Sequence, residues 1–171
     1  MSSVTPHVPT TGAVAQELLR RIGAGVPERI AELYAERIDW QLSWPRDEHG
    51  RAPTPWIRPR STRADAAAHF RELGAHHLPG GADTTIERIL VDGAQAVVLG
   101  EIRQTARATG RPYRARFALH LTVEDGLVVR HHVYEDSLAV ARAFEPGDDV
   151  RPVSPGTLAL PGAPAAPRHH R

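Results

Sequence analysis

The chain contains no cysteine among its 171 residues, so disulfide bonds and thiolate chemistry are both excluded. It also lacks an apolar run approaching the roughly 18 residues that a membrane-spanning helix needs. Residues 1–11 have no basic stretch followed by an apolar core, which is the mark of a secretory signal. From these absences we expect a cytoplasmic protein with no membrane partner.

Lysine is missing too, so every one of the 21 basic residues is arginine. Arginine suits phosphate recognition, which would fit a nucleic-acid partner. The arginines are interleaved with acids, however, and the net charge is only +1. Because a nucleic-acid binder should show a one-sided basic patch, we attribute the arginine content to a GC-rich bacterial coding preference and expect no nucleic-acid partner.

The rest of the composition is ordinary for one globular domain, with 41% hydrophobic and 24% charged residues. Residues 1–11 are rich in Ser, Thr and Pro, and residues 145–171 contain six prolines with few large apolar groups. We therefore expect a disordered N-terminal arm over 1–11, a folded domain over 12–144 and a disordered tail over 145–171.

Apolar residues at helical spacing predict three helices in the first half of the chain, over about 11–23, 27–38 and 62–73. The sequence Thr62-Arg63-Ala64-Asp65 fits a capping box at the start of the third helix. Residues 38–45 switch to period two, which predicts a first strand.

The stretch from Thr84 to Phe144 predicts three or four long antiparallel strands followed by a short helix. Between Tyr113 and Glu124, six apolar residues fall on one face and a single alanine lies among the other six, which is typical of a half-buried strand. Asp92-Gly93 and Asp125-Gly126 supply the positive φ angles of tight hairpin turns. The element order predicts an α+β fold, in which a curved antiparallel sheet packs on three N-terminal helices and encloses an internal pocket.

Several short segments carry a resemblance to a known family: Leu33-Tyr34-Ala35 before Asp39-Trp40, Pro55-Trp56, Val97-Val98-Leu99-Gly100, Thr109-Gly110-Arg111, Val123-Glu124-Asp125-Gly126 and Tyr134-Glu135-Asp136. Over about residues 12–144 the chain resembles the SnoaL-like branch of the nuclear transport factor 2-like superfamily. The resemblance implies a cone with an apolar pocket and a homodimer formed through the outer face of the sheet. Its members include polyketide cyclases, ketosteroid isomerases and epoxide hydrolases, so the fold leaves the reaction open.

Asp136 is the first candidate catalytic residue. The resemblance to limonene-epoxide hydrolases implies that this Asp, at the end of the last strand, acts as a base on water, and the rim of an apolar cone would raise its pKa. The alternative is structural. Asp136-Ser137 precedes an apolar helical stretch, so Asp136 can simply cap that helix.

Glu101, Arg103 and His132 are the other catalytic candidates. Glu101 and Arg103 share one strand face and either polarise a carbonyl group or form an ordinary exposed ion pair. His132 shares its alternation with Asp136, so we expect it in the pocket as a proton partner, unless its role is structural. His131 is then expected to point outward. Adjacent histidines diverge on a strand, so we expect no metal site.

The positions that ketosteroid isomerases and SnoaL-type cyclases would use carry Leu18, Trp44 and Leu119 here, which supports neither mechanism as written. The large or polar groups expected to line the pocket and contact a substrate are Tyr134, Trp40, Gln41, Ser43, Trp44, Trp56, Phe70, Phe117 and Leu119.

The sequence therefore predicts a small-molecule enzyme that performs acid/base chemistry without a cofactor. The reaction would be cyclisation, isomerisation, dehydration or water addition on a hydrophobic, oxygenated metabolite of polyketide or terpenoid type. The alternative is a binding or scaffold protein of the same fold, in which apolar groups line almost the whole pocket and Glu101 and Arg103 face water.

Overall fold

The computed structural model describes residues 8–42, 54, 56–80 and 82–146. In chain order its elements are α1 (Thr11–Ala24), α2 (Pro27–Ala31), β1 (Tyr34–Leu42), α4 (Arg63–His76), β2 (Asp83–Asp92), β3 (Gln95–Thr105), β4 (Pro112–Glu124), β5 (Leu127–Glu135) and α5 (Ser137–Phe144). Most of the predicted arm and tail lies outside the described residues.

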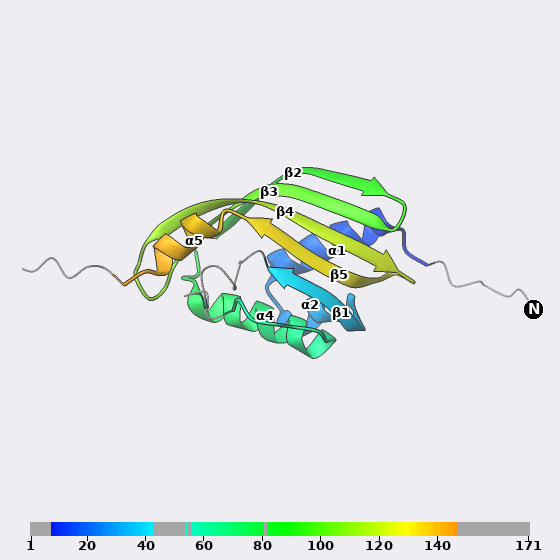
Figure 1. Cartoon of the computed structure of the whole chain (residues 1–171), viewed down its shortest axis with the longest axis horizontal. Helices are drawn as coiled ribbons and strands as arrows, with labels where there is room; N and C mark the ends of the chain where they lie inside the picture. The colour runs from blue at the N-terminus through cyan, green and yellow to red at the C-terminus, as the bar shows by residue number, and fades with distance from the viewer. Residues whose placement is uncertain (1–7, 43–53, 55, 81, 147–171) are drawn as a thin grey trace, which may run out of the picture.

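The strands form one curved, open sheet in the order β1-β5-β4-β3-β2 (Figure 1). Strands β2 to β5 are antiparallel hairpin neighbours, whereas β1 runs parallel to β5. The α+β prediction is confirmed. The predicted all-antiparallel sheet is wrong at β1, because α4 and three strands intervene between β1 and β5, and a connection of that length allows parallel pairing.

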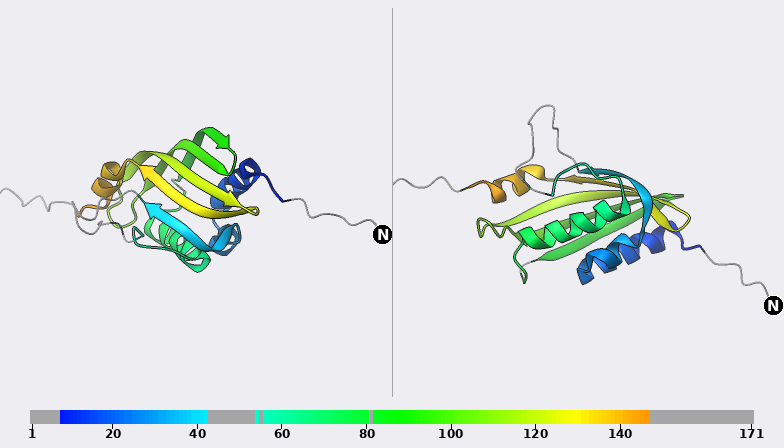
Figure 2. Two further views of the ribbon diagram at one scale, coloured as in Figure 1. Left: turned by 45° about the vertical axis from the view of Figure 1, so that its right-hand side comes forward. Right: turned by 90° about the horizontal axis from the view of Figure 1, so that it is seen from below.

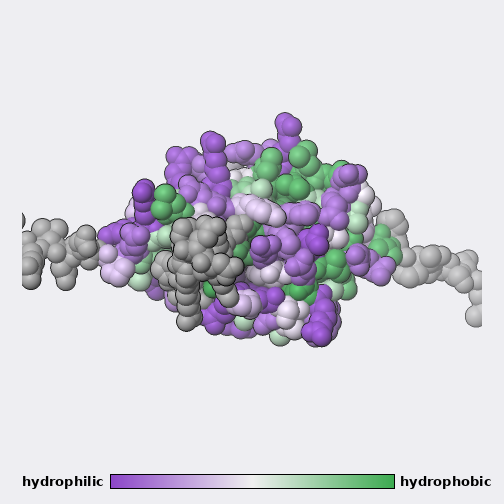
Figure 3. All heavy atoms as spheres, in the orientation of Figure 1, coloured by the Kyte–Doolittle hydropathy of each residue, from purple (hydrophilic) through white to green (hydrophobic). Residues whose placement is uncertain are grey.

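Helices α1, α2 and α4 cover one face of the sheet, and α5 follows β5 at one end (Figure 2). The main core lies between these helices and the sheet. Its fully buried side chains include Leu18, Ile30, Tyr34, Val98 and Leu121. No helix among the described residues combines the length and apolar character needed to cross a bilayer. In the view of Figure 3 the surface is mostly hydrophilic, with hydrophobic residues gathered towards its upper right.

The second predicted helix is shorter than expected, because α2 ends at Ala31 and Tyr34 already starts β1. Tyr34 and Ile38 are both buried, and their four-residue spacing imitates a helix. A strand explains the same burial, because side chains four residues apart lie on one face at a period of two, so this spacing does not distinguish the two structures.

The predicted turn at Asp125-Gly126 and the predicted cap are confirmed, whereas at Asp92-Gly93 only the glycine has a positive φ, because Asp92 still belongs to β2 and pairs with Gln95. Asp125 and Gly126 have φ angles of 49° and 76°, as a two-residue hairpin of the type I′ kind requires, and Gly93 has a φ of 55°. At the start of α4, Thr62 and Asp65 form the reciprocal capping box. Helix α4 runs past Gly74 to His76, three residues beyond the predicted end.

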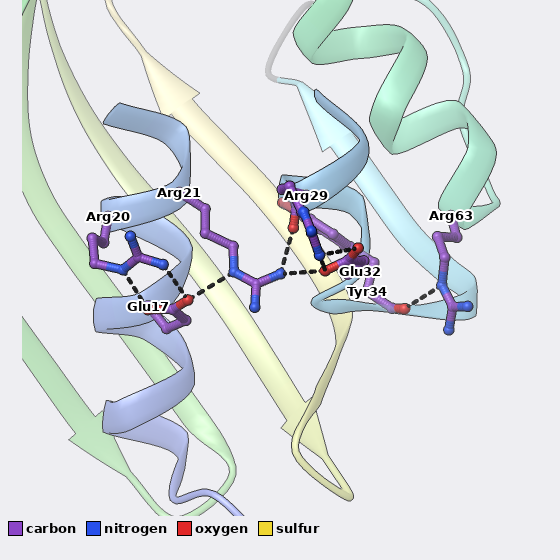
Figure 4. A network of polar contacts seen from close by, with 7 residues as sticks. All are labelled: Glu17, Arg20, Arg21, Arg29, Glu32, Tyr34 and Arg63. Carbon is purple, nitrogen blue, oxygen red and sulfur yellow. Dashed lines mark hydrogen bonds and ion pairs between the residues drawn. The ribbon is translucent and has the colours of Figure 1, made fainter. Parts of the chain in front are cut away.

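Polar contacts fix the start of β1 to the helices beneath it. Arg21 of α1 bonds to Glu17 and, at 3.0 Å, to Glu32 at the end of α2. Arg63, the first residue of α4, donates from Nε to the backbone carbonyl of Tyr34 at 2.8 Å (Figure 4). Tyr34 is therefore held by its backbone as well as by its buried ring.

Strand β5 contains a bulge that decides which of its side chains face the helices. Val123 pairs with Val128, but the preceding Thr122 pairs with Arg130, so Val129 has no partner on β4. One extra residue in a strand reverses the alternation beyond it. Both Val128 and His131 consequently point towards the helices.

Gly100 lies where β3 passes closest to its neighbours. A Cβ atom at this position would lie 2.5 Å from the carbonyl oxygen of Thr85 and 2.9 Å from the ring of Phe117. The missing side chain thus lets the Phe117 ring lie against the strand on the helix-facing side.

We predict that Gly100→Ala lowers the free energy of unfolding by about 1–3 kcal/mol, because the added methyl group meets a backbone oxygen that cannot move freely. Gly74→Ala is the matched control. Its Cβ meets nothing within 4 Å, so a helix-interior alanine should stabilise by about 0.5–1 kcal/mol. Urea denaturation of both variants measures the two effects, and a neutral Gly100→Ala would contradict the close approach.

Candidate functional site

A cavity of about 160 Å³ lies between the concave face of the sheet and the helices. Its walls are mainly apolar and come from α1, α4, α5, the strands and Trp56. They consist of Leu19, Ile22, Leu42, Trp56, Phe70, Leu73, Ile102, Phe117, Leu119, Val133 and Val140. Six lining residues carry polar groups: His69, Thr84, Gln104, Tyr113, His131 and Glu135.

Glu135 brings the one carboxylate among the lining residues, from the last position of β5. It lies opposite Phe117 on β4 and faces the cavity because of the bulge earlier in the strand. Burial among apolar groups raises the pKa of Glu135 to about 7, and the negative charge of Asp136 adds to the shift. Near neutral pH this carboxyl group can therefore both accept and donate a proton.

His131 is the buried imidazole of the cavity. Its Nδ1 lies 2.9 Å from the hydroxyl oxygen of Tyr34, and its ring stacks on Trp40 with centroids 4.0 Å apart and planes within 4°. Burial, reinforced by the neighbouring His132, lowers the pKa of His131 to about 3. The imidazole is thus neutral at any physiological pH.

His69 of α4 contributes a second buried imidazole, 4% exposed. It packs edge-on against Trp40 and hydrogen-bonds to the Trp56 backbone, whereas its Nδ1 has no partner among the described residues. Burial lowers the pKa of His69 well below its ordinary value, with the nearby His131 as the next cause. Both imidazoles of the cavity therefore remain uncharged.

Tyr113 takes part in a short chain of hydrogen bonds at the cavity wall. Its hydroxyl lies 2.7 Å from Nε2 of His77 and 2.7 Å from Oε1 of Gln104. His77 Nδ1 lies 2.7 Å from the carbonyl oxygen of Leu73 in α4. Burial and the nearby Glu135 raise the pKa of Tyr113, so the phenol stays protonated.

Asp136 lies outside the lining of this cavity. It is exposed and forms the N-cap of α5, accepting a hydrogen bond from the backbone N–H of Ala139 at 3.1 Å. This is the helix-capping alternative of the sequence analysis. The carboxylate that faces the cavity is that of the preceding residue, Glu135.

The predicted orientations of His131 and His132 are wrong, because the alternation was counted from Asp136, which caps α5 and does not line the cavity. His132 lies on the outer face of the sheet, where Nε2 is 3.0 Å from Asp39 and the ring packs against His120. His120 of β4 also lies on this outer face. On β5, the inward face carries the odd-numbered residues His131, Val133 and Glu135, so the residue before Asp136 is the one that shares a face with His131.

Glu101 and Arg103 also lie on the outer face, away from the cavity. Glu101 Oε1 accepts hydrogen bonds from Arg103 at 3.1 Å and from Arg114 on β4 at 2.8 Å. Both arginines are more than half exposed, which makes this the cross-strand ion pair of the alternative interpretation.

Of the residues predicted to contact a substrate, Trp56, Phe70, Phe117 and Leu119 line the cavity. Trp40 lies behind His131, whereas Gln41 and Tyr134 are exposed, with Tyr134 on the outer face. Ser43 and Trp44 lie outside the described residues.

Three further cavity residues were not predicted from the sequence: Glu135, His131 and His69. His69 was detectable, since it falls three residues after Ala66 on the buried stripe of the third predicted helix. Among the described residues, no group of three or more His, Cys, Asp or Glu side chains could hold a metal ion.

A family model for the SnoaL-like domain matches residues 15–131, which is more than half of the chain. The chain belongs to the SnoaL-like domain family. No curated protein sequence matched the chain.

Solved structures show the same fold at low sequence identity. An NTF2-like protein from Burkholderia thailandensis E264 matches with a TM-score of 0.68 and 20% identity, covering 81% of this chain and 99% of that one. A putative isomerase from Rhodopseudomonas palustris matches with a TM-score of 0.64 and 18% identity, covering 82% and 97%. TerC, co-crystallised with polyporic acid, matches with a TM-score of 0.61 and 17% identity, covering 78% and 99%. These similarities confirm the nuclear transport factor 2-like cone for this SnoaL-like protein.

We predict that Asp136→Ala lowers the free energy of unfolding by about 1 kcal/mol, because the N-cap of α5 loses its acceptor. Asp136→Asn is the control, since asparagine caps about as well and should cost far less. Urea denaturation compares the two variants. Equal losses in both would show that the charge of Asp136, and not its cap, is what stabilises the protein.

We also predict a pH-dependent effect of Glu135→Gln on stability. A carboxyl group whose pKa is raised on folding favours the folded state at low pH, and this contribution is lost between about pH 4.5 and 7 as the buried group ionises. The glutamine side chain does not ionise and so avoids that loss. The free energy of unfolding of the variant, measured relative to that of the parent protein, should therefore be up to about 3 kcal/mol higher above pH 7 than at pH 4. Urea denaturation at several pH values measures the difference. Glu124→Gln, at an exposed position on β4, is the control for the substitution itself.

Proposed function

We propose that this SnoaL-like protein transfers protons on a small hydrophobic, oxygenated molecule of polyketide or terpenoid type, with Glu135 as the catalytic base and no cofactor. The observation that carries the proposal is the position of Glu135, a carboxylate set among apolar walls of a cavity with its pKa raised to about 7. At neutral pH, a carboxyl group with a pKa near 7 is ionised in a large fraction of the molecules and is also a stronger base than an ordinary carboxylate.

The cavity supports a ligand of about one or two rings, since an apolar cavity of about 150 Å³ is large enough for benzene. Its aromatic walls, Trp56, Phe70 and Phe117, suit a flat, largely apolar ligand. Proteins of the same fold include a putative isomerase and one co-crystallised with polyporic acid, which is in keeping with this ligand class.

In the proposed reaction the Glu135 carboxylate removes a proton from carbon or from a water molecule. When the proton comes from carbon, the protonated Glu135 returns it to another atom of the same intermediate, which completes an isomerisation or cyclisation, or gives it to a leaving hydroxyl group, which departs as water in a dehydration. When the proton comes from water, the hydroxide adds to the ligand, and Glu135 gives the proton to the atom that receives the displaced electron pair, which completes a water addition. Glu135 replaces Asp136 in the role that the sequence suggested, because Asp136 caps α5.

A reporter of buried bases tests the proposal directly. The ring of nitrobenzisoxazole opens when a base removes its C–H proton, with cleavage of the N–O bond and release of a coloured phenolate. We expect kcat/KM to rise with pH through an apparent pKa of about 7. Glu135→Gln should lower it by roughly 10²- to 10⁴-fold.

Asp136→Asn, which keeps the helix cap, controls for the change of a neighbouring charge and should retain the activity. If the parent protein and Glu135→Gln turn over the reporter equally slowly, Glu135 is not a functional base.

The second candidate is a binding protein of the same fold without chemistry. The mainly apolar lining and the outward position of Glu101 and Arg103 favour it. Under this alternative, the reporter or a similar bicyclic compound binds and changes the fluorescence of Trp56, but the parent protein does not accelerate ring opening.

A further inference from the structure

Three aromatic rings hold His131 in one orientation at the cavity wall. Trp40 stacks flat on one face of the imidazole, and the edge of Phe70 approaches at 6.5 Å between centroids. The Tyr34 hydroxyl fixes the ring corner that carries Nδ1. Tyr34 is itself fully buried, and its backbone carbonyl is bound by Arg63 (Figure 4).

This arrangement determines which nitrogen of His131 carries the proton. The hydroxyl hydrogen of Tyr34 has one acceptor among the described residues, Nδ1 of His131. If Nδ1 carried the hydrogen, the Tyr34 hydroxyl would be a donor buried without a partner, which destabilises the folded protein. Tyr34 therefore donates to Nδ1, and the hydrogen of the neutral imidazole is on Nε2.

We propose that the Nε2–H group of His131 binds the carbonyl oxygen of the ligand, with Tyr34 as the positioning residue that keeps the hydrogen on Nε2. The ligand class is thus a small cyclic ketone or enone. This inference deepens the proposed function and rests on it for the chemical step. Its support is that His131 lines the cavity while its Nδ1 is occupied by Tyr34.

The positions of His131 and Glu135 suit the two ends of one ring. They are four residues apart on the same face of β5, which places their Cα atoms about 13 Å apart at about 3.3 Å per residue. Two inward side chains then leave space for a ring between an N–H donor and a carboxylate.

The step is an enolisation that balances without a further reactant. Glu135 takes the proton from the carbon next to the carbonyl group, and the C–H electron pair forms a C=C bond. The carbonyl π pair moves to oxygen, where the Nε2–H group of His131 stabilises the negative charge and keeps its own proton. Glu135 then returns its proton to carbon. A neutral imidazole suits this role because it donates a hydrogen bond without giving up its hydrogen, and burial keeps His131 neutral.

The tautomer is measured in the parent protein by nitrogen NMR of the histidine rings at neutral pH. We expect His131 to show a protonated Nε2 and an unprotonated, hydrogen-bonded Nδ1. Tyr34→Phe, which keeps the ring but removes the hydroxyl group, should turn this into a mixture of tautomers. Tyr113→Phe is the matched control, because its hydroxyl contacts His77 and its loss should shift only the His77 signals. A protonated Nδ1 or an imidazolium at His131 in the parent protein would overturn the inference.

Ligand recognition is measured with cyclohexenone, through the infrared stretch of its carbonyl group. Binding to the parent protein should lower the carbonyl frequency below its value in an apolar solvent. In Tyr34→Phe the frequency should be lowered less. An unshifted carbonyl band in the bound state would refute carbonyl recognition by His131. This failure differs from that of the proposed function, because nitrobenzisoxazole has no carbonyl group and its opening depends on Glu135.

Discussion

The arrangement of the cavity depends on one extra residue in the last strand. Because Val129 lies unpaired opposite β4, the residues after it change face, and the cavity receives His131, Val133 and Glu135. Without the bulge, Arg130, His132 and Tyr134 would occupy those positions. A strand that delivered an arginine and a tyrosine to an apolar interior would bury polar groups without partners, so the bulge and the hydrophobic walls require each other.

Packing around the bent sheet then gives the cavity its shape. The absence of a side chain at Gly100 allows Phe117 to lie against β3, and Phe117 in turn forms the part of the wall beside Glu135. On the other side, His69 and Phe70 of α4 meet Trp40 edge-on. The start of α4 is held by the Thr62–Asp65 capping box and by the hydrogen bond from Arg63 to Tyr34. These contacts fix the helix, and so its aromatic side chains, relative to β1.

Electrostatics in this interior follow from burial more than from charge pairing. Burial is the largest cause of the shifts at Glu135, His131 and His69, and in each case it favours the neutral form. The ion pairs of Glu101 and of Asp39 lie on the outer face, where water screens them. The outer face of the sheet thus carries the charged, structural contacts. The inner face carries neutral groups that can bind a ligand and exchange protons with it.

The sequence by itself determined the α+β class, the hairpin turns at Gly93 and Asp125-Gly126 and the capping box of α4, since each depends on residues close together in the chain. It also predicted four residues of the apolar wall, Trp56, Phe70, Phe117 and Leu119. It also predicted the family through segments spread over the domain. Only the tertiary structure decided that β1 runs parallel to β5, that Asp136 caps a helix, and that Glu135 and His131 face the cavity in place of Asp136 and His132. The physical reason is that the direction of strand pairing and the face that a strand turns towards the helices depend on how strands fit each other across the sheet. The alternation within a single strand does not show how it pairs with its neighbour.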